Sequence, residues 1–201
     1  IPNVVDTKIF YPAREVEKNS TFEFLHVSSL NDRHKNVSGI LEAFAVLLSQ
    51  GFDAYLTIVG NGFYGKHQNS IDRLSLQSNV SLVKELSIHG IADAMRKSKV
   101  LVLFSNYENA PCVISEAHCT GIPVISTNVG GVAEMIDKDN GLLIKPKDQS
   151  SLVEAMKWMI KNHIQYDAPA IRQKAVLEYA IDRIAQKYVE VYRRVQSEHG
   201  N

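Results

Sequence analysis

Two glutamates separated by seven residues are the side chains of this sequence best placed to do chemistry. Glu108 lies in an expected loop after an apolar strand, and Glu116 lies about two helical turns further on. Between them we expect a helix amino terminus, where free N–H groups and the helix dipole attract phosphate. The two carboxylates could flank an anionic ligand there. An acidic cap and a surface charge explain the spacing equally well, so the spacing alone leaves both interpretations open.

A glycine pattern, G-x-G-x-x-G, runs from Gly60 to Gly65 after an expected strand. Glu85 follows 20 residues after Gly65, where the ribose-binding acid of a dinucleotide site could stand. That fingerprint belongs to the first strand–helix turn of its fold, whereas here a full strand and helix come first. We therefore favour a plain glycine turn.

Other patterns with possible chemistry are weaker. Asp137 and Asp139 could hold a metal, but a solvated turn before Asn140 is the favoured interpretation, and we expect no metal site. None of the seven histidines forms H-E-x-x-H, and His118 is expected to pack within a helix. The sequence contains no G-x-S-x-G elbow, so it gives no support for serine hydrolase chemistry.

Strands and helices alternate along most of the chain. Short β-rich or apolar runs predict strands at 22–28, 55–59, 80–83, 100–104, 123–126 and 141–144. Helical spacing predicts helices at 37–48, 64–76, 91–98, 111–120, 131–136, 152–160 and about 180–196. We expect Asn36 to cap the first helix, Pro111 to lie in the first turn of the fourth, and Ser151 with Glu154 to form a capping box.

This alternation predicts an α/β fold, a doubly wound Rossmann-like domain with a six-stranded parallel sheet. Ligands of such folds bind at the carboxyl ends of the strands. Function is therefore expected in the turns after Val27, Val59, Val83, Phe104 and Ser126.

Composition excludes several classes of protein. With 45% hydrophobic and 22% charged residues, the chain of 201 residues matches an ordinary globular domain rather than a disordered one. Lys and Arg (22) balance Asp and Glu (22), so no strong electrostatic footprint for nucleic acid exists. No apolar run is long enough to span a membrane. Cys112 and Cys119, expected about 10 Å apart on one helix, are predicted to be free thiols in a reducing cytoplasm.

The glutamate pair is followed by two further motifs, Gly121-Ile122-Pro123-Val124-Ile125 and Gly130-Gly131-Val132-Ala133-Glu134-Met135-Ile136. Together they resemble glycosyltransferase family 4, a family of retaining, nucleotide-sugar-dependent enzymes with the GT-B fold. The opening Ile1-Pro2-Asn3-Val4-Val5-Asp6 resembles the family's interdomain segment, Ile-Pro-Asn-Gly-Val-Asp. The family also has a Val-Gly-x-Gly turn, which Val59-Gly60-Asn61-Gly62 resembles. This resemblance leaves little support for a dinucleotide site at these glycines.

The resemblance implies one half of a two-domain enzyme. Residues 1–201 would form the carboxyl-terminal, donor-binding domain, with 1–21 as the interdomain segment and 180–196 as the last helix. An amino-terminal domain, carrying most acceptor contacts, would be missing, and the first residue, Ile1 rather than Met, agrees with a fragment. The apolar stripe from Ile181 to Val195 would pack partly against that domain.

Residue roles also follow from the resemblance. Glu108 would be the catalytic glutamate beside the donor sugar, Glu116 would bind the ribose hydroxyls, and Lys35 would neutralise the diphosphate. The remaining expected donor-binding residues are Ser29, Arg33, Gly60, Val83, Lys84, Glu85, Asn109, Ala110, Pro111, Cys112 and Val113.

The sequence departs from the family at two places. The family's diphosphate-binding arginine in Val-Gly-Arg-Leu is replaced by Ser29, and Arg33 either supplies the missing charge or is a solvated loop residue. The family's Glu-Gly-Phe-Gly becomes Glu108-Asn109-Ala110-Pro111, and Pro111 removes one backbone donor.

The function implied is transfer of a sugar from a UDP- or GDP-sugar to a saccharide or lipid-linked acceptor, in bacterial surface polysaccharide synthesis. No cofactor and no nucleic-acid partner are expected. The implied location is cytoplasmic, with peripheral inner-membrane association of the full-length protein left open. Two alternatives also stay open: another GT-B enzyme, such as a nucleotide-sugar epimerase or a phosphorylase, and a non-catalytic nucleotide-binding module.

Overall fold

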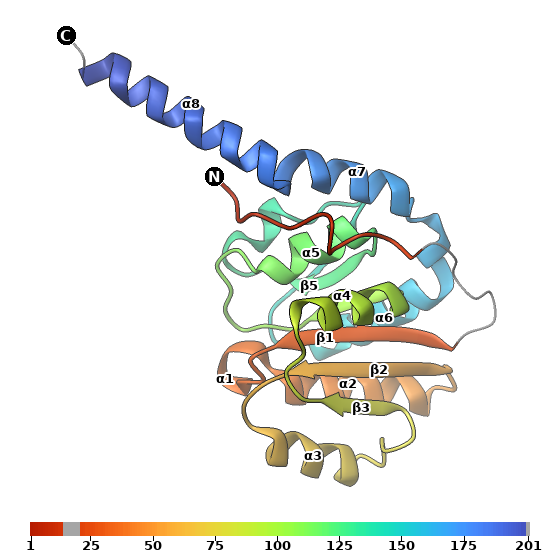
Figure 1. Cartoon of the computed structure of the whole chain (residues 1–201). Helices are drawn as coiled ribbons and strands as arrows, with labels where there is room; N and C mark the ends of the chain where they lie inside the picture. Colours follow the sequence, from red (N-terminus) through yellow and green to blue (C-terminus); the bar gives the residue numbers. More distant parts are fainter. Residues whose placement is uncertain (14–20, 200–201) are drawn as a thin grey trace.

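The computed structural model of this chain describes residues 1–13 and 21–199, and its six parallel strands form one sheet (Figure 1). The strands lie in the order β3-β2-β1-β4-β5-β6. The strands are β1 (Phe22–Ser28), β2 (Ala54–Gly60), β3 (Val80–Val83), β4 (Val100–Leu103), β5 (Val124–Thr127) and β6 (Gly141–Ile144). This order confirms the predicted doubly wound fold, and its direction reverses between β1 and β4.

Helices connect the strands and continue past the last one. They are α1 (Asp32–Lys35), α2 (Val37–Ser49), α3 (Tyr64–Arg73), α4 (Ile88–Lys97), α5 (Cys112–Thr120), α6 (Gln149–Asn162), α7 (Ala168–Tyr179) and α8 (Ile181–His199). Two short 3-10 helices are η1 (Gly130–Glu134) and η2 (His163–Gln165).

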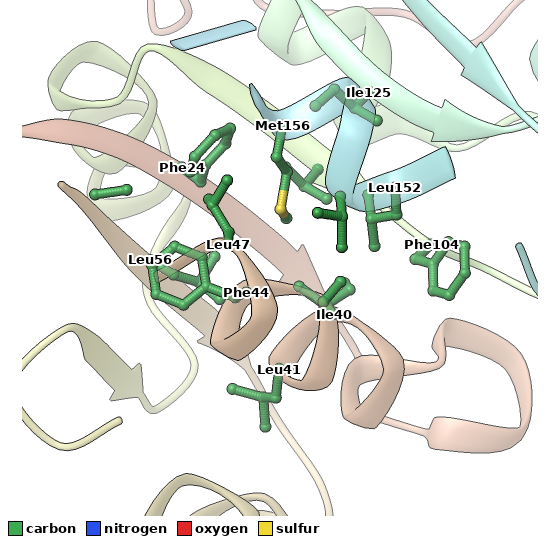
Figure 2. Close-up of a cluster of buried hydrophobic side chains, with 14 of the residues drawn as sticks. Phe24, Ile40, Leu41, Phe44, Leu47, Leu56, Phe104, Ile125, Leu152 and Met156 are labelled. Atoms are coloured by element: carbon green, nitrogen blue, oxygen red, sulfur yellow. The ribbon is translucent and has the colours of Figure 1, made fainter. Parts of the chain in front are cut away.

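Two apolar layers enclose the sheet. On one face, α2, α3 and α6 bury aliphatic and aromatic side chains against the strands. Figure 2 shows Ile40, Phe44 and Leu47 of α2 gathered with Leu152 and Met156 of α6. The other face is covered by α4, α5 and α7. Because successive strand side chains point to opposite faces, β1 places Phe24 in the first layer and Leu25 in the second.

The amino-terminal segment is tied to the second layer. Val5 forms a parallel bridge with Ala180, and its N–H donates to Tyr179 O at 2.9 Å. Arg172 of α7 donates to the carbonyls of Phe10 (2.8 Å) and Thr7 (3.2 Å). Beyond this contact α8 extends away from the body of the domain (Figure 1). Residues 14–20 of the expected interdomain segment lie outside the described residues.

Three predicted helix starts need correction. Asn36 precedes α2 but its side chain makes no capping bond, because it adopts a left-handed φ of 49° that ends α1. Pro111 stands before α5 as its N-cap rather than in its first turn. The prediction of a Ser151–Glu154 capping box is wrong, because α6 begins at Gln149, three residues earlier than predicted. Asp148 is the N-cap residue, and its carboxylate accepts a hydrogen bond from Ser151 N at 3.0 Å.

Two α-helices and the 3-10 helix η2 were not predicted, and several bounds move by a few residues. The four-residue α1 is too short to show a period, and α7 carries apolar residues around its circumference. The helix expected at 91–98 begins at Ile88, where Ser87 caps it, and the one expected at 131–136 is the 3-10 helix η1. Both cysteines are free, as predicted. Within residues 1–13 and 21–199, no helix has the length and apolar character needed to span a membrane.

Candidate functional site

The candidate site lies at the carboxyl edge of the sheet, on the left in Figure 1, where the segments after β1 and β4 meet. These two strands are neighbours, paired from Phe24 with Val100, and the winding direction of the chain reverses between them. Helices on either side of such a reversal diverge and leave a crevice. Lys35 follows β1 and Glu108 follows β4, so both lie on the segments that leave the sheet at this reversal.

Lys35 and Glu108 form an ion pair, with 2.7 Å between Nζ and Oε1. The Glu108 side chain is 6% exposed and that of Lys35 is 23% exposed. Ser105 Oγ donates to the same carboxylate oxygen at 2.7 Å. Thr127 of β5 in turn donates to the Ser105 carbonyl at 2.6 Å. The protein thus compensates the buried negative charge with one cation and one hydroxyl.

Two glycines after β5 hold the backbone that carries Glu108. Gly130 has a φ of +55°, and a Cβ added there would lie 1.9 Å from the Glu108 carbonyl oxygen. Gly131 N donates to Asn109 O at 2.9 Å. Glycine is required at position 130 because no other residue fits this approach.

The short helix α1 is anchored to the loop after β4. Asn106 N donates to His34 O at 2.7 Å, and Asn106 Nδ2 donates to Arg33 O at 3.1 Å. The rings of His34 and Tyr107 meet edge to face with centroids 6.2 Å apart. These contacts fix the Lys35 backbone relative to Glu108.

Asp32 ties α1 to two further helices. Its carboxylate accepts from Ser38 N of α2 at 2.8 Å and pairs with Lys66 of α3. Burial acts to raise the pKa of Asp32, but the bonds from Lys66 and Ser38 outweigh it and hold that pKa below its usual value. Asp32 is therefore an ionised anchor for the turn that carries Lys35.

Glu116 lies on the second turn of α5 and differs from Glu108. Its side chain is half-buried, and its carboxylate makes no hydrogen bond or ion pair with any residue in the described ranges. Burial raises the pKa of Glu116 to about 7. A carboxyl with open acceptor positions and an unfavourable ionisation gains from a ligand that donates hydrogen bonds to it.

The amino terminus of α5 lies between the two glutamates. Its helical residues begin with Cys112, so the amides of Cys112 and Val113 belong to the first turn, where helix N–H groups lack helical partners. Asn109, Ala110 and Cys112 are exposed. From the amino-terminal segment, Asn3 Nδ2 donates to Ala110 O at 3.1 Å.

The other expected donor-binding residues form a second group around the ends of β2 and β3. Gly60 must be glycine, since a Cβ there would lie 1.8 Å from Ser28 O. Tyr64 OH bonds the carbonyl oxygens of Gly60 and Val83, and Asn61 Nδ2 donates to Glu85 at 3.3 Å. Ser29, Arg33, Lys84 and Glu85 are exposed. The structure therefore joins Lys35 directly to Glu108, while the expected base-side turn, Val83 to Glu85, lies two strands away from β1.

Several residues that shape the site were not singled out from the sequence. Ser105, Thr127, Asp32 and Lys66 all bond to the elements that carry Lys35 and Glu108. The contacts of Thr127 with Ser105 and of Lys66 with Asp32 join residues distant in sequence, and the short spacings of Ser105 from Glu108 and of Asp32 from Ser38 follow no recognised motif. Only the rule that parallel strands share a carboxyl edge could place Ser105 and Thr127 together. No cluster of three or more metal-ligating side chains occurs in the part of the chain that the structure describes.

Comparison with known proteins identifies the family. A model of the family "Glycosyl transferases group 1" matches residues 8–176. Among curated relatives, a UDP-Gal:alpha-D-GlcNAc-diphosphoundecaprenol alpha-1,3-galactosyltransferase of Escherichia coli is 30% identical over 172 residues, covering 78% of this chain and 43% of that protein. A GDP-mannose-dependent mannosyltransferase of Corynebacterium glutamicum that acts on monoacylated phosphatidylinositol monomannoside is 24% identical over 196 residues, covering 89% and 51%.

Solved structures agree on the fold. The Anabaena protein HepE, crystallised with UDP, superimposes with a TM-score of 0.83 at 21% identity, over 96% of this chain and 56% of that one. The chain spans about half the length of the curated relatives it matches.

Proposed function

This chain belongs to the glycosyl transferases group 1 family, and from that membership we propose that it is the donor-binding domain of a retaining glycosyltransferase. The observation that carries the proposal is the Lys35–Glu108 ion pair on the segments that follow β1 and β4, where the winding of the sheet reverses. The α5 amino terminus and the unpartnered Glu116 carboxyl follow Glu108 along the chain. Residues 1–21 would be the interdomain segment and 180–196 part of the last helix, with an acceptor-binding domain elsewhere in the protein.

The proposed donor is a nucleoside diphosphate sugar. Glu116 offers two carboxylate oxygens, which match the vicinal hydroxyls of a ribose. Lys35 and the first-turn amides of α5 would stabilise the diphosphate. Backbone groups from Asn109 to Val113, including Ala110, Pro111 and Cys112, would face the sugar and phosphates. Gly60, Val83, Lys84 and Glu85 would border the base, and Ser29 and Arg33 the diphosphate.

The proposed reaction breaks the bond between the sugar C1 and the diphosphate oxygen, which leaves with the electron pair. Lys35 and the helix terminus stabilise that developing charge. Glu108, held by Lys35 and Ser105, lies beside the sugar through an oxocarbenium-like state. An acceptor hydroxyl attacks C1 from the face that the diphosphate leaves, and its proton passes to the departing phosphate oxygen. Front-face attack retains the configuration at C1.

The relatives support either a uridine or a guanosine diphosphate sugar as donor, and a role in polysaccharide or glycolipid synthesis. The E. coli relative is named for UDP-Gal and a diphosphoundecaprenol acceptor, and the C. glutamicum relative for GDP-mannose. HepE binds UDP in its crystal. We propose a UDP- or GDP-sugar as donor and a saccharide or lipid-linked acceptor, used in bacterial surface polysaccharide synthesis at the cytoplasmic side of the inner membrane.

The test is binding of UDP, GDP and ADP to the chain, followed by calorimetry and by the shift in melting temperature. A ligand of the folded state raises stability by about RT ln(1 + [L]/Kd). We expect one diphosphate to bind, and Lys35→Ala and Glu116→Ala to weaken it at least tenfold. Matched controls are Lys138→Ala and Glu154→Ala, whose side chains are 90% and 70% exposed and bind no part of the site. Undiminished binding in both site variants would refute these residue roles.

Product analysis with the protein that carries this chain separates transfer from the competing activity. Sugar joined to an acceptor, in an acceptor-dependent reaction, supports the proposal. A free epimerised sugar formed without acceptor would assign a nucleotide-sugar epimerase instead.

A further inference from the structure

Leu30, at the exit of β1, has a backbone conformation that is unusual for its type. Its φ is +51°, in the left-handed region, although its side chain is fully buried. A residue with a Cβ and a bulky side chain avoids this region unless its surroundings hold it there. Something around Leu30 must therefore fix the turn.

A hydrogen-bond chain holds the N–H group of Leu30. His26 Nδ1 lies 2.8 Å from Val102 O, which accepts only, so Nδ1 carries the proton and donates. His26 Nε2, 2.7 Å from Ser28 Oγ, then accepts from that hydroxyl. The same Oγ accepts from Leu30 N at 3.1 Å. Every partner in this chain has a defined donor or acceptor role.

The imidazole of His26 is neutral in this arrangement. Burial lowers the pKa of His26 to about 4, and the nearby Lys35 and His67 act in the same direction. A charged His26 ring would carry a second proton on Nε2, so Nε2 could no longer accept a hydrogen bond from the Ser28 hydroxyl. That hydroxyl would then have to turn its proton elsewhere. Neutrality of His26 and orientation of Ser28 are thus linked.

A second buried histidine holds the other side of the same peptide unit. His67 Nε2, on α3, lies 2.9 Å from Leu30 O and must donate to it. Its Nδ1 has no hydrogen-bond partner in the described part of the chain. His67 therefore donates from Nε2 and His26 donates from Nδ1, so the two rings hold the turn through opposite nitrogens.

The turn at Leu30 leads directly to the candidate site. The next residue, Asn31, caps α1 by accepting from Arg33 N at 3.0 Å, and α1 ends at Lys35. Lys66, beside His67 on α3, binds Asp32 in the middle of the same turn. Strand β1 and helix α3 therefore both fix the direction in which residues 31–35 leave the sheet.

We propose that His26, Ser28 and His67 form a clamp around Leu30 whose role is to position Lys35 for Glu108 and for a bound diphosphate. The three are positioning residues, since none touches the expected ligand. The diphosphate part rests on the proposed function. The clamp itself does not, because its bonds join residues of the protein alone.

The first experiment tests the clamp in the absence of nucleotide. It uses ¹⁵N NMR of the histidine side chains in the full chain near pH 7 to locate the ring protons, and it measures the exchange rate of the Leu30 amide. We expect His26 as the neutral Nδ1–H tautomer and His67 with a proton on Nε2, with the Leu30 amide slow to exchange. The variant Ser28→Ala should speed exchange of that amide at least tenfold. A charged His26, the opposite tautomer in either ring, or unchanged Leu30 exchange in Ser28→Ala would overturn the clamp.

The second experiment connects the clamp to binding of UDP or GDP. His67→Leu should raise Kd about tenfold, and His67→Gln, which retains a donor near the Nε2 position, should recover most of that loss. The control is His118→Leu, which removes another buried histidine with Nε2 3.2 Å from a carbonyl oxygen, that of Asn140. An equal loss in His118→Leu, or no rescue by glutamine, would reduce His67 to a packing role and overturn the proposal. If no nucleotide binds the wild-type chain while the first experiment succeeds, the proposed function fails and the clamp stands.

Discussion

The two glutamates of the site stand in opposite electrostatic situations. Glu108, in the loop after β4, is almost fully buried, yet Lys35 and Ser105 both contact its carboxylate at 2.7 Å. Glu116, on α5, is half-buried without a hydrogen-bond partner in the described chain, and burial raises its pKa to about 7. The comparison shows that the protein supplies partners to the carboxylate of Glu108 and none to that of Glu116 in the described residues, as the proposed ligand-binding role of Glu116 requires.

The difference lies in the elements that carry them. Glu108 sits on irregular backbone clamped by Gly130, Gly131 and the α1 turn. Glu116 sits on the second turn of the regular helix α5, and its side chain has no hydrogen-bond partner in the described residues. Mutations on the Glu108 side should therefore harm stability as well as nucleotide binding, whereas mutations of Glu116 should harm binding without a loss of stability.

The largest effect is expected from Gly130→Ala, which attacks the support of Glu108. The left-handed φ of +55° and a Cβ 1.9 Å from Glu108 O together should cost about 3 kcal/mol of unfolding free energy. Urea denaturation measures it. The control is Gly51→Ala, with a φ of +84° and no atom within 4 Å of its Cβ, which should cost only about 1 kcal/mol. Equal losses in the two variants would remove the role of the Gly130 contact.

Lys35→Met should come next, because it leaves the Glu108 carboxylate buried without a cation. We expect a loss of about 2 kcal/mol, below the usual range for fully buried pairs since Lys35 is 23% exposed. The double variant Lys35→Met/Glu108→Gln should recover part of that stability, as a double-mutant cycle measured by urea denaturation would reveal. Additive losses would mean that the two side chains do not stabilise each other.

Glu116→Gln should have the opposite sign. The folded-state pKa of Glu116 lies above that of an unfolded glutamate, so its ionisation costs stability as pH rises through about 7. Removing that charge should stabilise the chain by about 1 kcal/mol at pH 8 and change little at pH 4. Thermal unfolding at the two pH values tests this, with Glu154→Gln as an exposed control. Destabilisation at pH 8 would show that Glu116 already has a favourable partner.

The smallest effect concerns the pH dependence of nucleotide affinity. If ribose hydroxyls donate to ionised Glu116, Kd should fall a few-fold between pH 6 and pH 8 as the group loses its proton. Calorimetry of the wild type and Glu116→Gln gives the comparison, since titration of the nucleotide phosphate is common to both. Parallel pH profiles in the two proteins would exclude Glu116 from the binding step.

The sequence predicted more features of the fold than of the candidate site. Alternating periodicities indicated all six strands, because each is a short apolar or β-rich run. Helix α7 was missed because its apolar residues do not gather on one face and so show no helical period. The N-cap of α6 was misplaced because Asp148, three residues before Ser151, accepts the hydrogen bond from Ser151 N.

At the site, the sequence indicated Lys35, Glu108 and Glu116. It did not indicate that Lys35 pairs with Glu108 while Glu116 has no partner in the described residues. The Lys35–Glu108 contact joins residues 73 positions apart, and its geometry depends on a left-handed Leu30 that no residue preference predicts. His26 and Ser28 do share a strand face by their spacing of two, which is the one local signal of the clamp. Roles that arise from tertiary contacts needed the structure.

The most direct test is an NMR titration of the Glu116 carboxyl carbon in the free chain and in the chain saturated with UDP or GDP. We predict a pKa of about 7 without ligand, and a fall of more than one unit when the nucleotide is bound. Titration near the ordinary glutamate value in the free chain, or a pKa unchanged by both nucleotides, would contradict the claim that this carboxylate is reserved for a ligand.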